Sequence, residues 1–183
     1  MVFVGENYQL TGMGKFRYQV IIFFVVLLLA SCGKISTLPD VPKIEFTSFS
    51  VFDTVDILGN FAKGGRLKFY FEDGDGDIGL PPPVEGQLTD SMDLFLTLYR
   101  INDGIKSLAP DDDPLSPSNY RIPYIDRQGQ NKILQGTIAV TFFYLFYNEE
   151  DSISYDFYIK DRAEHVSNTA STRSIAVFVN GEY

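Results

Sequence analysis

Cysteine and histidine are almost absent from this chain: each occurs once, as Cys32 and His165. A single cysteine excludes an intramolecular disulfide, so the core has to hold the fold. A single histidine excludes a histidine metal cage, and a Ser-His-Asp triad would have to use His165 itself. Tryptophan is absent, which weakens a sugar-stacking interpretation, although eleven tyrosines and sixteen phenylalanines could take its place.

Positive charge is also scarce. The chain has 15 Lys and Arg residues against 24 Asp and Glu residues, a net charge of −9 at pH 7. This balance argues against a nucleic-acid partner, because affinity for phosphates comes from clustered Lys and Arg. Cations, neutral glycans or another envelope protein are easier partners for such a surface.

The one long apolar run, residues 20–30, is too short to span a bilayer as a helix, which needs about 20 residues. It follows two basic residues, Lys15 and Arg17, and fits the h-region of a secretory signal peptide. Residues 29–32 then read Leu-Ala-Ser-Cys, which resembles the bacterial lipobox. In lipoproteins of that kind the peptide is cut before the cysteine, whose thiol carries diacylglycerol. We therefore expect lipid on Cys32 to anchor the protein to a membrane.

The expected domain organisation follows from this anchor. Residues 1–31 form the lipoprotein signal peptide, and translation is expected to start at Met13, because residues 1–12 add length that a signal peptide does not need. Residues 32–42 form a lipidated tether in which two prolines favour an extended chain. Residues 43–183 form one domain of ordinary size.

Beyond the tether, apolar and polar residues alternate with a period of two. In residues 66–72, for example, Leu67, Phe69 and Phe71 alternate with polar or charged neighbours. Such alternation is typical of strands with one buried and one wet face. It predicts strands over 43–51, 66–72, 94–100, 137–144, 153–160 and 172–179, and a short edge strand near 120–125.

Two details refine these strands. In residues 43–51 the apolar parity changes between Phe46 and Phe49, which predicts a bulge or a switch between sheets. Pro123 places the short strand near 120–125 at an edge, because proline cannot donate to a ladder. No segment shows a helical stripe. Six or seven antiparallel strands with Gly-, Pro-, Asp- and Asn-rich connections predict an all-β fold, an antiparallel β-sandwich.

Two segments carry a family resemblance: FYFEDGDGDIGL at 69–80 and YDFYIKDRAEHVSN at 155–168. Together with the lipobox and the opening KIEFTSFS, they resemble a family of Bacteroidota lipoproteins with a single immunoglobulin-like domain. The second segment also resembles the last hairpin of bacterial immunoglobulin-like modules, which often end Asp-x-Ala-Gly-Asn-x-Ser. Here Glu164 and His165 replace the Gly and Asn of that pattern. The resemblance implies an immunoglobulin-like β-sandwich and an envelope location, and no activity.

Sorting is inferred by analogy with that phylum, in which acidic residues soon after the lipidated cysteine send lipoproteins to the cell surface. Residues 33–37 contain no acid, and Gly33 is not the aspartate that marks inner-membrane retention in other bacteria. We therefore expect an outer-membrane lipoprotein of the cell envelope that faces the periplasm.

The sequence Asp73-Gly74-Asp75-Gly76-Asp77 directly follows a predicted strand and places three carboxylates on one tight loop. Calcium prefers six to eight oxygen ligands at about 2.3–2.6 Å, which such loops supply. Carboxylates crowded this closely repel one another unless something neutralises them. The loop is a candidate structural Ca²⁺ site, and the alternative is an acidic, glycine-rich turn without an ion.

The loop alone cannot complete an EF-hand. Ile78 stands at the sixth position, where an EF-hand has glycine, and Val84 at the twelfth, where it has a bidentate acid. In an immunoglobulin-like fold the F–G loop lies at the same end as the B–C loop. Asp161 and Asn168, in the predicted F–G loop, could therefore add oxygens to the site.

No catalytic constellation emerges. His165 falls in a predicted hairpin turn, and the acidic runs at 111–113 and 149–151 are expected to be a solvated loop and a turn. Nothing places two acids about 5–10 Å apart across a cleft, as a glycosidase needs. Tyr70 and Tyr158, on the outward parity, are the better candidates for an exposed binding face.

These observations favour a non-catalytic binding or structural module. One alternative is a glycan-binding accessory of an outer-membrane nutrient-uptake system, which an exposed aromatic row on one sheet would favour. The other is a hydrolase, which a deep cleft with two converging carboxylates would favour.

Replacement of the lone cysteine tests the anchor. The wild-type protein is expected to incorporate radiolabelled palmitate and to partition into a detergent phase, because its cysteine carries the lipid. Cys32→Ala is expected to do neither. Labelling that survives in this variant would contradict the lipobox assignment.

Overall fold

The structure is a computed structural model that describes Ile22 and residues 38–83, 91–126 and 132–183. The chain divides into two units, Met1–Ser36 and Thr37–Tyr183, and the fold described below belongs to the second. Apart from Ile22, the predicted signal peptide lies outside the described residues, and so does Cys32. No helix in the described part of the chain is long and apolar enough to cross a membrane.

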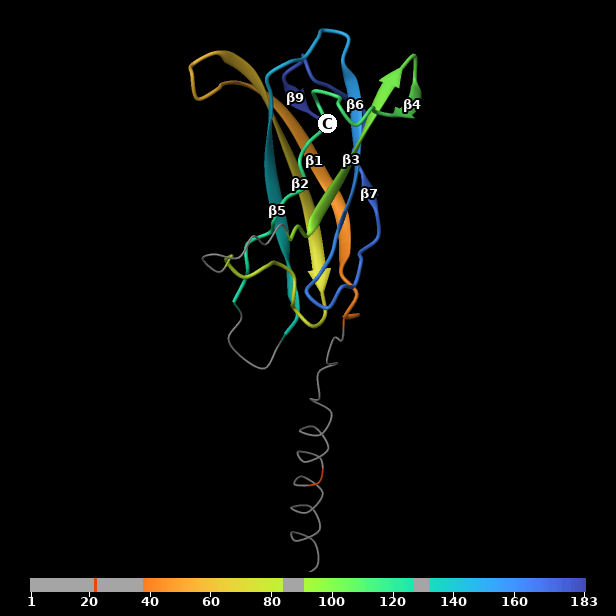
Figure 1. Cartoon of the computed structure of the whole chain (residues 1–183). Helices are drawn as coiled ribbons and strands as arrows, with labels where there is room; N and C mark the ends of the chain where they lie inside the picture. The colour runs from red at the N-terminus through yellow and green to blue at the C-terminus, as the bar shows by residue number, and fades with distance from the viewer. Residues whose placement is uncertain (1–21, 23–37, 84–90, 127–131) are drawn as a thin grey trace, which may run out of the picture. The chain divides into compact units, whose positions relative to one another are not determined.

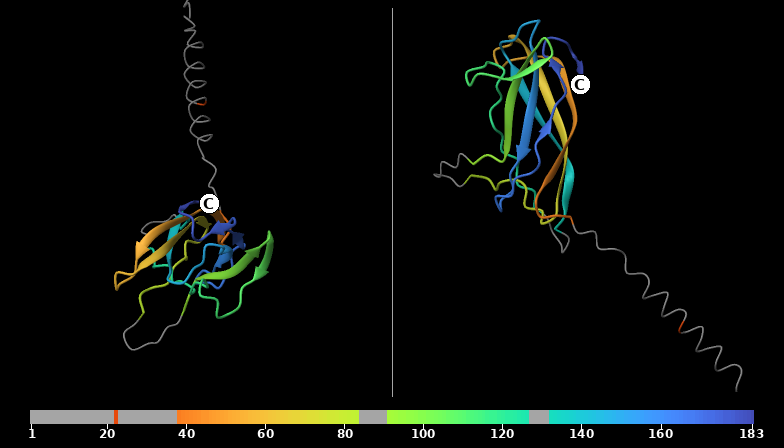
Figure 2. Two further views of the ribbon diagram at one scale, coloured as in Figure 1. Left: turned by 90° about the horizontal axis from the view of Figure 1, so that it is seen from above. Right: turned by 90° about the vertical axis from the view of Figure 1, so that its right-hand side faces the viewer.

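Two antiparallel sheets face each other in the second unit and form the predicted β-sandwich (Figure 1). The described strands are β1 (Lys43–Val55), β2 (Phe61–Asp73), β3 (Leu94–Asn102), β4 (Ile105–Leu108), β5 (Leu134–Tyr144), β6 (Ser152–Ile159), β7 (Ala170–Ser171), β8 (Ile175–Ala176) and β9 (Gly181–Glu182). The first sheet has the order β5-β2-β1-β9 and the second β4-β3-β6-β7, with β8 also paired to β6. The β1–β2 and β3–β4 hairpins project to opposite sides at one end of the sandwich (Figures 1 and 2).

The predicted alternation is confirmed where the two sheets meet. Phe69 of β2 and Phe157 of β6 are both fully buried, and their ring centroids lie 5.2 Å apart. Tyr155 of β6 is equally buried and stacks on Phe49 of β1 at 5.9 Å. Each buried side chain of this size contributes about 1.5–3 kcal/mol by leaving water. Strands with this period therefore close a core without a disulfide.

The parity change in the first strand is a β-bulge. Phe46 pairs with Phe69, whereas Ser48 pairs with Lys68, so Thr47 is an additional residue on β1. Thr47 is exposed, and the extra residue returns Phe49 to the buried face. The bulge predicted from the sequence is confirmed, and β1 stays within one sheet.

The predicted last strand over 172–179 is wrong. Three separate two-residue strands, β7, β8 and β9, replace it. The physical reason lies at Thr172, whose Oγ1 accepts a hydrogen bond from Tyr155 N at 2.9 Å and donates to Arg173 O at 2.9 Å. This side chain takes the place of a ladder partner, so regular pairing stops after Ser171.

Two further expectations need correction. The edge strand near 120–125 exists only as isolated bridges of Tyr120 to Leu94 and of Pro123 to Leu80, since proline lacks the donor that a ladder needs. Strand β4 was not predicted. It pairs with β3 through a turn at Asp103 and Gly104, where φ is +50° and +77°. Asp-Gly is a known hairpin signal, so the sequence does contain the information that predicts this turn.

The sequence predicts a solvated loop for the acidic run at 111–113, and this prediction is wrong for Asp113. Asp113 forms a bidentate pair with Arg100, at 2.7 Å to Nε and 2.8 Å to Nη2, and the same guanidinium contacts Asp151. Asp151 itself ends the predicted turn, in which its N–H donates to Asn148 O. The side chains of Asp113 and Asp151 are only 5% and 11% exposed, so Arg100 ties two loops to β3.

Removal of this guanidinium should destabilise the domain strongly. Arg100→Ala leaves two nearly buried carboxylates without their cation, and we expect a loss of about 3 kcal/mol in the free energy of unfolding. Lys106→Ala is the matched control, because the Lys106–Asp156 pair is more exposed and its loss should cost about 0.5 kcal/mol. Urea unfolding measures both, and equal effects would contradict the structural role of Arg100.

Candidate metal centre

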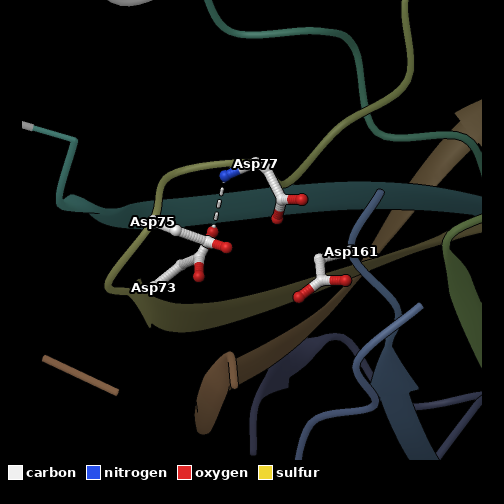
Figure 3. A group of neighbouring side chains, drawn as sticks. All are labelled: Asp73, Asp75, Asp77 and Asp161. Atoms are coloured by element: carbon white, nitrogen blue, oxygen red, sulfur yellow. Dashed lines mark hydrogen bonds between the residues drawn. The ribbon is translucent and has the colours of Figure 1, made fainter. Parts of the chain in front are cut away.

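Four aspartates meet at the end of the sandwich where β1 begins. Asp73 is the last residue of β2, Asp75 and Asp77 follow in the next loop, and Asp161 lies two residues past the end of β6. Each offers a carboxylate oxygen, and these oxygens all lie within 4.8 Å of one another. Figure 3 shows Asp161 facing the three loop carboxylates from the segment that follows β6. The predicted proximity of the two loops is therefore confirmed.

The glycines of this loop are required by close backbone contacts. Gly76 has a φ of +70°, and a Cβ there would lie 1.8 Å from the carbonyl oxygen of Lys132. A Cβ on Gly74 would lie 2.2 Å from the carbonyl oxygen of Leu38. The N–H of Gly74 donates to Pro39 O at 2.9 Å. The alternation of Asp and Gly thus lets the loop pack against the tether on one side and the start of β5 on the other.

His165 orients the fourth carboxylate. Its backbone N–H donates to Asp161 Oδ1 at 2.7 Å, and its Nδ1 lies 2.9 Å from Asp161 Oδ2. This hydrogen bond and the charge of Asp161 raise the pKa of His165. His165 thus keeps the predicted turn position, with a side chain that is 40% exposed, and makes a contact with Asp161 that we did not predict. An Asp and a His four residues apart within one predicted turn was the signal that could have indicated the contact.

The side chain of Asn168, the fifth predicted donor, binds a residue of the first strand. Its Oδ1 accepts a hydrogen bond from Ile44 N at 2.9 Å, and its Nδ2 donates to Ile44 O at 2.9 Å. The side-chain amide thus matches both polar groups of one β1 residue and is used in full. Of the five predicted oxygen donors, the structure brings together Asp73, Asp75, Asp77 and Asp161, and assigns Asn168 to holding the first strand.

Three of the four carboxylates have an oxygen without a donor. Asp73 Oδ1, Asp75 Oδ1 and Asp77 Oδ1 are buried and have no hydrogen-bond partner. The other oxygen of Asp73 accepts from Asp77 N at 2.9 Å, and the whole Asp73 side chain is shielded from solvent. Buried acceptors are normally paired, so a cluster of three unpaired oxygens marks a place that lacks a positive group.

The electrostatics agree with this description. Burial raises the pKa of Asp73 to about 6, and the charges of Asp75 and Asp77 act in the same direction. Burial also raises the pKa of Asp77, together with the charges of Asp161 and Asp75, although nearby Arg162 opposes the shift. Asp73 and Asp77 therefore resist ionisation next to the neighbouring carboxylates.

Arg162 does not neutralise the group by direct contact. Its Nη1 donates to Gly79 O at 2.8 Å, and its guanidinium lies over the ring of Tyr124, 4.8 Å from the centroid. Among the described residues, no lysine or arginine forms an ion pair with Asp73, Asp75 or Asp77. The three loop carboxylates therefore have no direct ion-pair partner in the described part of the chain, although the charge of Arg162 acts on Asp77 from nearby.

A hard divalent cation fits this arrangement. Two oxygens bound to one calcium ion lie at most about 5 Å apart, which matches the separation of the four carboxylates. Oxygen donors without nitrogen or sulfur also suit calcium or magnesium better than zinc. The sixth position of the loop, Ile78, is fully buried in the core, so the loop does not adopt the EF-hand turn that glycine permits there.

No protein-family model matches this chain, and comparisons with curated proteins and with solved structures returned no significant similarity. The resemblance to Bacteroidota lipoproteins therefore stays a prediction. Inference about function depends on the chemistry of the site itself.

The raised pKa of Asp73 predicts how the metal-free domain responds to pH. A carboxyl that binds its proton more tightly in the folded state stabilises the fold below the unfolded pKa of 3.8. That stability is lost as the pH rises through about 6. In EDTA we expect the ionisation of Asp73 to lower the free energy of unfolding by about 2–3 kcal/mol between pH 4 and pH 7.

Asp73→Asn should remove most of this loss, because an amide accepts the same hydrogen bond without ionising. Asp111→Asn, at an exposed position, is the control and should leave the pH profile unchanged. Urea unfolding at several pH values measures the difference. Parallel profiles for the wild type and Asp73→Asn would refute the assignment.

Proposed function

We propose that this chain is a membrane-anchored lipoprotein of the bacterial cell envelope with a non-catalytic binding or structural module that carries a structural Ca²⁺ ion. One observation carries the metal assignment. Asp73 is fully buried, yet one of its oxygens has no partner and faces three further carboxylates. An isolated buried charge of this kind is costly, and a bound cation removes the cost. The lipobox at Cys32 and the sorting residues support an outer-membrane protein that faces the periplasm.

The strand order supports an immunoglobulin-like fold as part of this proposal. With β1 as strand A, β2 as B, β3 as C, β5 as E and β6 as F, the sheets read E-B-A and C-F. Immunoglobulin domains pair A, B and E in one sheet and C, F and G in the other. The B–C and F–G loops then share one end of the sandwich, where the four aspartates meet.

The metal would have a mechanical role at this end. The loop that carries Asp75 holds Pro39 through the N–H of Gly74, and Asn168 holds Ile44 a few residues later. Both contacts fix the segment through which the chain enters the domain from the predicted tether. A cation shared by β2, its loop and the end of β6 would join the two sheets at that point, as a cross-link does in disulfide-bonded domains.

The glycan-binding accessory is the second candidate. That candidate requires an exposed aromatic row, whereas the rings of Phe95, Tyr99 and Tyr158 on the outer face of the second sheet are half-buried. Phe95 and Tyr158 stack on each other at 5.0 Å, and the ammonium of Lys106 lies 4.0 Å from the centroid of Tyr99. One face of each ring is therefore already covered. The aspartates converge on one point instead of flanking a cleft, which also argues against a hydrolase.

Calcium should raise the thermal stability of the domain Thr37–Tyr183, which forms a compact unit with its own core. At a hundredfold excess over the dissociation constant, the free energy of unfolding should rise by about 2.7 kcal/mol relative to EDTA. The double substitution Asp75→Ala and Asp77→Ala should abolish the difference. Calorimetry in the two buffers measures it.

The matched control is the substitution of Asp111 and Asp112 by alanine, which removes two exposed acids elsewhere. This variant should keep the full response to calcium. Identical melting of the wild type with millimolar calcium and with EDTA would show that the loop is an acidic turn without an ion.

A further inference from the structure

Strand β5 ends the first sheet with an unusually open edge. It has 11 residues, and no described strand pairs with the side opposite β2. Its sequence, LQGTIAVTFFY, contains no charged residue and no proline. The other outer strands are short: β4 has four residues and includes Lys106, and β7 and β9 have two each. Proteins usually protect long edge strands with charge or proline, so the bare edge of β5 calls for an explanation.

An apolar groove of about 500 Å³ runs beside this edge. Ile138 and Val140 of β5 line one wall, and Tyr120, Ile122 and Ile125 line the other. Ile138 and Val140 lie on the inward face of β5, yet they are only partly buried. The opposite wall follows the second sheet, where Tyr120 is bonded to Leu94 of β3. The core of the sandwich is therefore open to solvent along this flank.

Cations lie beside this edge in an otherwise acidic chain. Arg66 and Lys68 lie on the outer face of β2, opposite the groove, and pair with Thr141 and Ala139 of β5. Arg121 borders the groove itself, where its guanidinium donates to two backbone carbonyl oxygens. None of these three cations forms an ion pair with a described residue. A second copy placed against β5 would bring two identical sets of unpaired cations together. The charge therefore favours a different, acidic partner.

We propose that β5 and this groove bind an extended segment of a partner protein in which apolar residues alternate with acidic residues. The segment adds to the sheet as a new strand and bonds through its backbone to the free N–H and C=O groups of β5. Its apolar side chains, every second residue, enter the groove between the sheets and cover Ile138 and Val140. The acidic side chains between them lie on the outer face of the sheet and approach Arg66 and Lys68. Strand addition of this kind completes the core at its open flank.

A designed probe tests this proposal. The fluorescein-labelled peptide Thr-Val-Asp-Val-Asp-Val-Thr is titrated into the domain Thr37–Tyr183 and followed by fluorescence anisotropy. Saturable binding that unlabelled peptide displaces is expected. A peptide with lysine in place of each aspartate should bind several-fold more weakly, because it meets the cations of the flank. A peptide with N-methylated valines should not bind, because it lacks the ladder donors.

Variants localise the binding to β5. Ile138→Lys places an ammonium in the apolar groove and should weaken binding roughly tenfold or more. Ser107→Lys makes the same change at an exposed position of β4, the outer strand of the other sheet, and should leave binding unchanged. Thermal unfolding of both variants establishes that they remain folded.

Three outcomes would overturn the proposal. The acidic peptide fails to bind the wild-type domain, or it binds Ile138→Lys as tightly as the wild type. Alternatively, sedimentation shows a wild-type dimer that Ile138→Lys converts to a monomer, in which case a second copy occupies the edge. The calcium response is measured separately, so failure here leaves the metal site standing.

Discussion

The contact between Phe69 and Phe157 sets the geometry on which the rest of the domain depends. The two rings meet in the centre of the sandwich, one from each sheet, and both are fully buried. Because the described chain has no disulfide, packing of this kind has to fix how one sheet lies on the other. Asp73 lies four residues after Phe69, and Asp161 lies four residues after Phe157. The register that the core selects therefore also places the two deepest carboxylates of the candidate metal centre opposite each other.

The domain treats its acidic residues in three ways. Some carboxylates are paired with a cation, as Asp113 is with Arg100, and these pairs hold loops to the sheets. Others, such as Asp111, are exposed and interact with water. Asp73, Asp75 and Asp77 are gathered at the end of β2 with buried oxygens that no donor meets, which costs free energy in the absence of a ligand. These gathered carboxylates indicate function, because the folded state is less stable for keeping them together.

The two proposed sites lie on different parts of the same sandwich and use different physics. The metal centre depends on charge concentrated where two strands end, next to the entry of the tether at Pro39. The open flank depends on what is missing beside β5, namely a strand that would cover Ile138 and Val140. A cation that rigidifies one end of the sheets would leave the free edge of β5 available. The domain could therefore be held firmly where the chain enters it and still accept a partner along its side.

Local pattern was sufficient to determine the five longest strands, the bulge at Thr47 and the three-carboxylate loop from the sequence, because each depends on residues within a few positions of one another. The sequence also indicated that Asp161 would meet that loop, through the strand order of the resembled fold. It could not determine that Asn168 would instead bind Ile44, that Thr172 would interrupt the last strand, or that Arg100 would hold Asp113. Those contacts join segments far apart in the chain, and side chains with several possible partners choose among them only when the sheets are packed. The complete burial of Asp73 and the open edge of β5 were decided in the same way, since burial and edge position are properties of neighbours in space and not of neighbours in sequence.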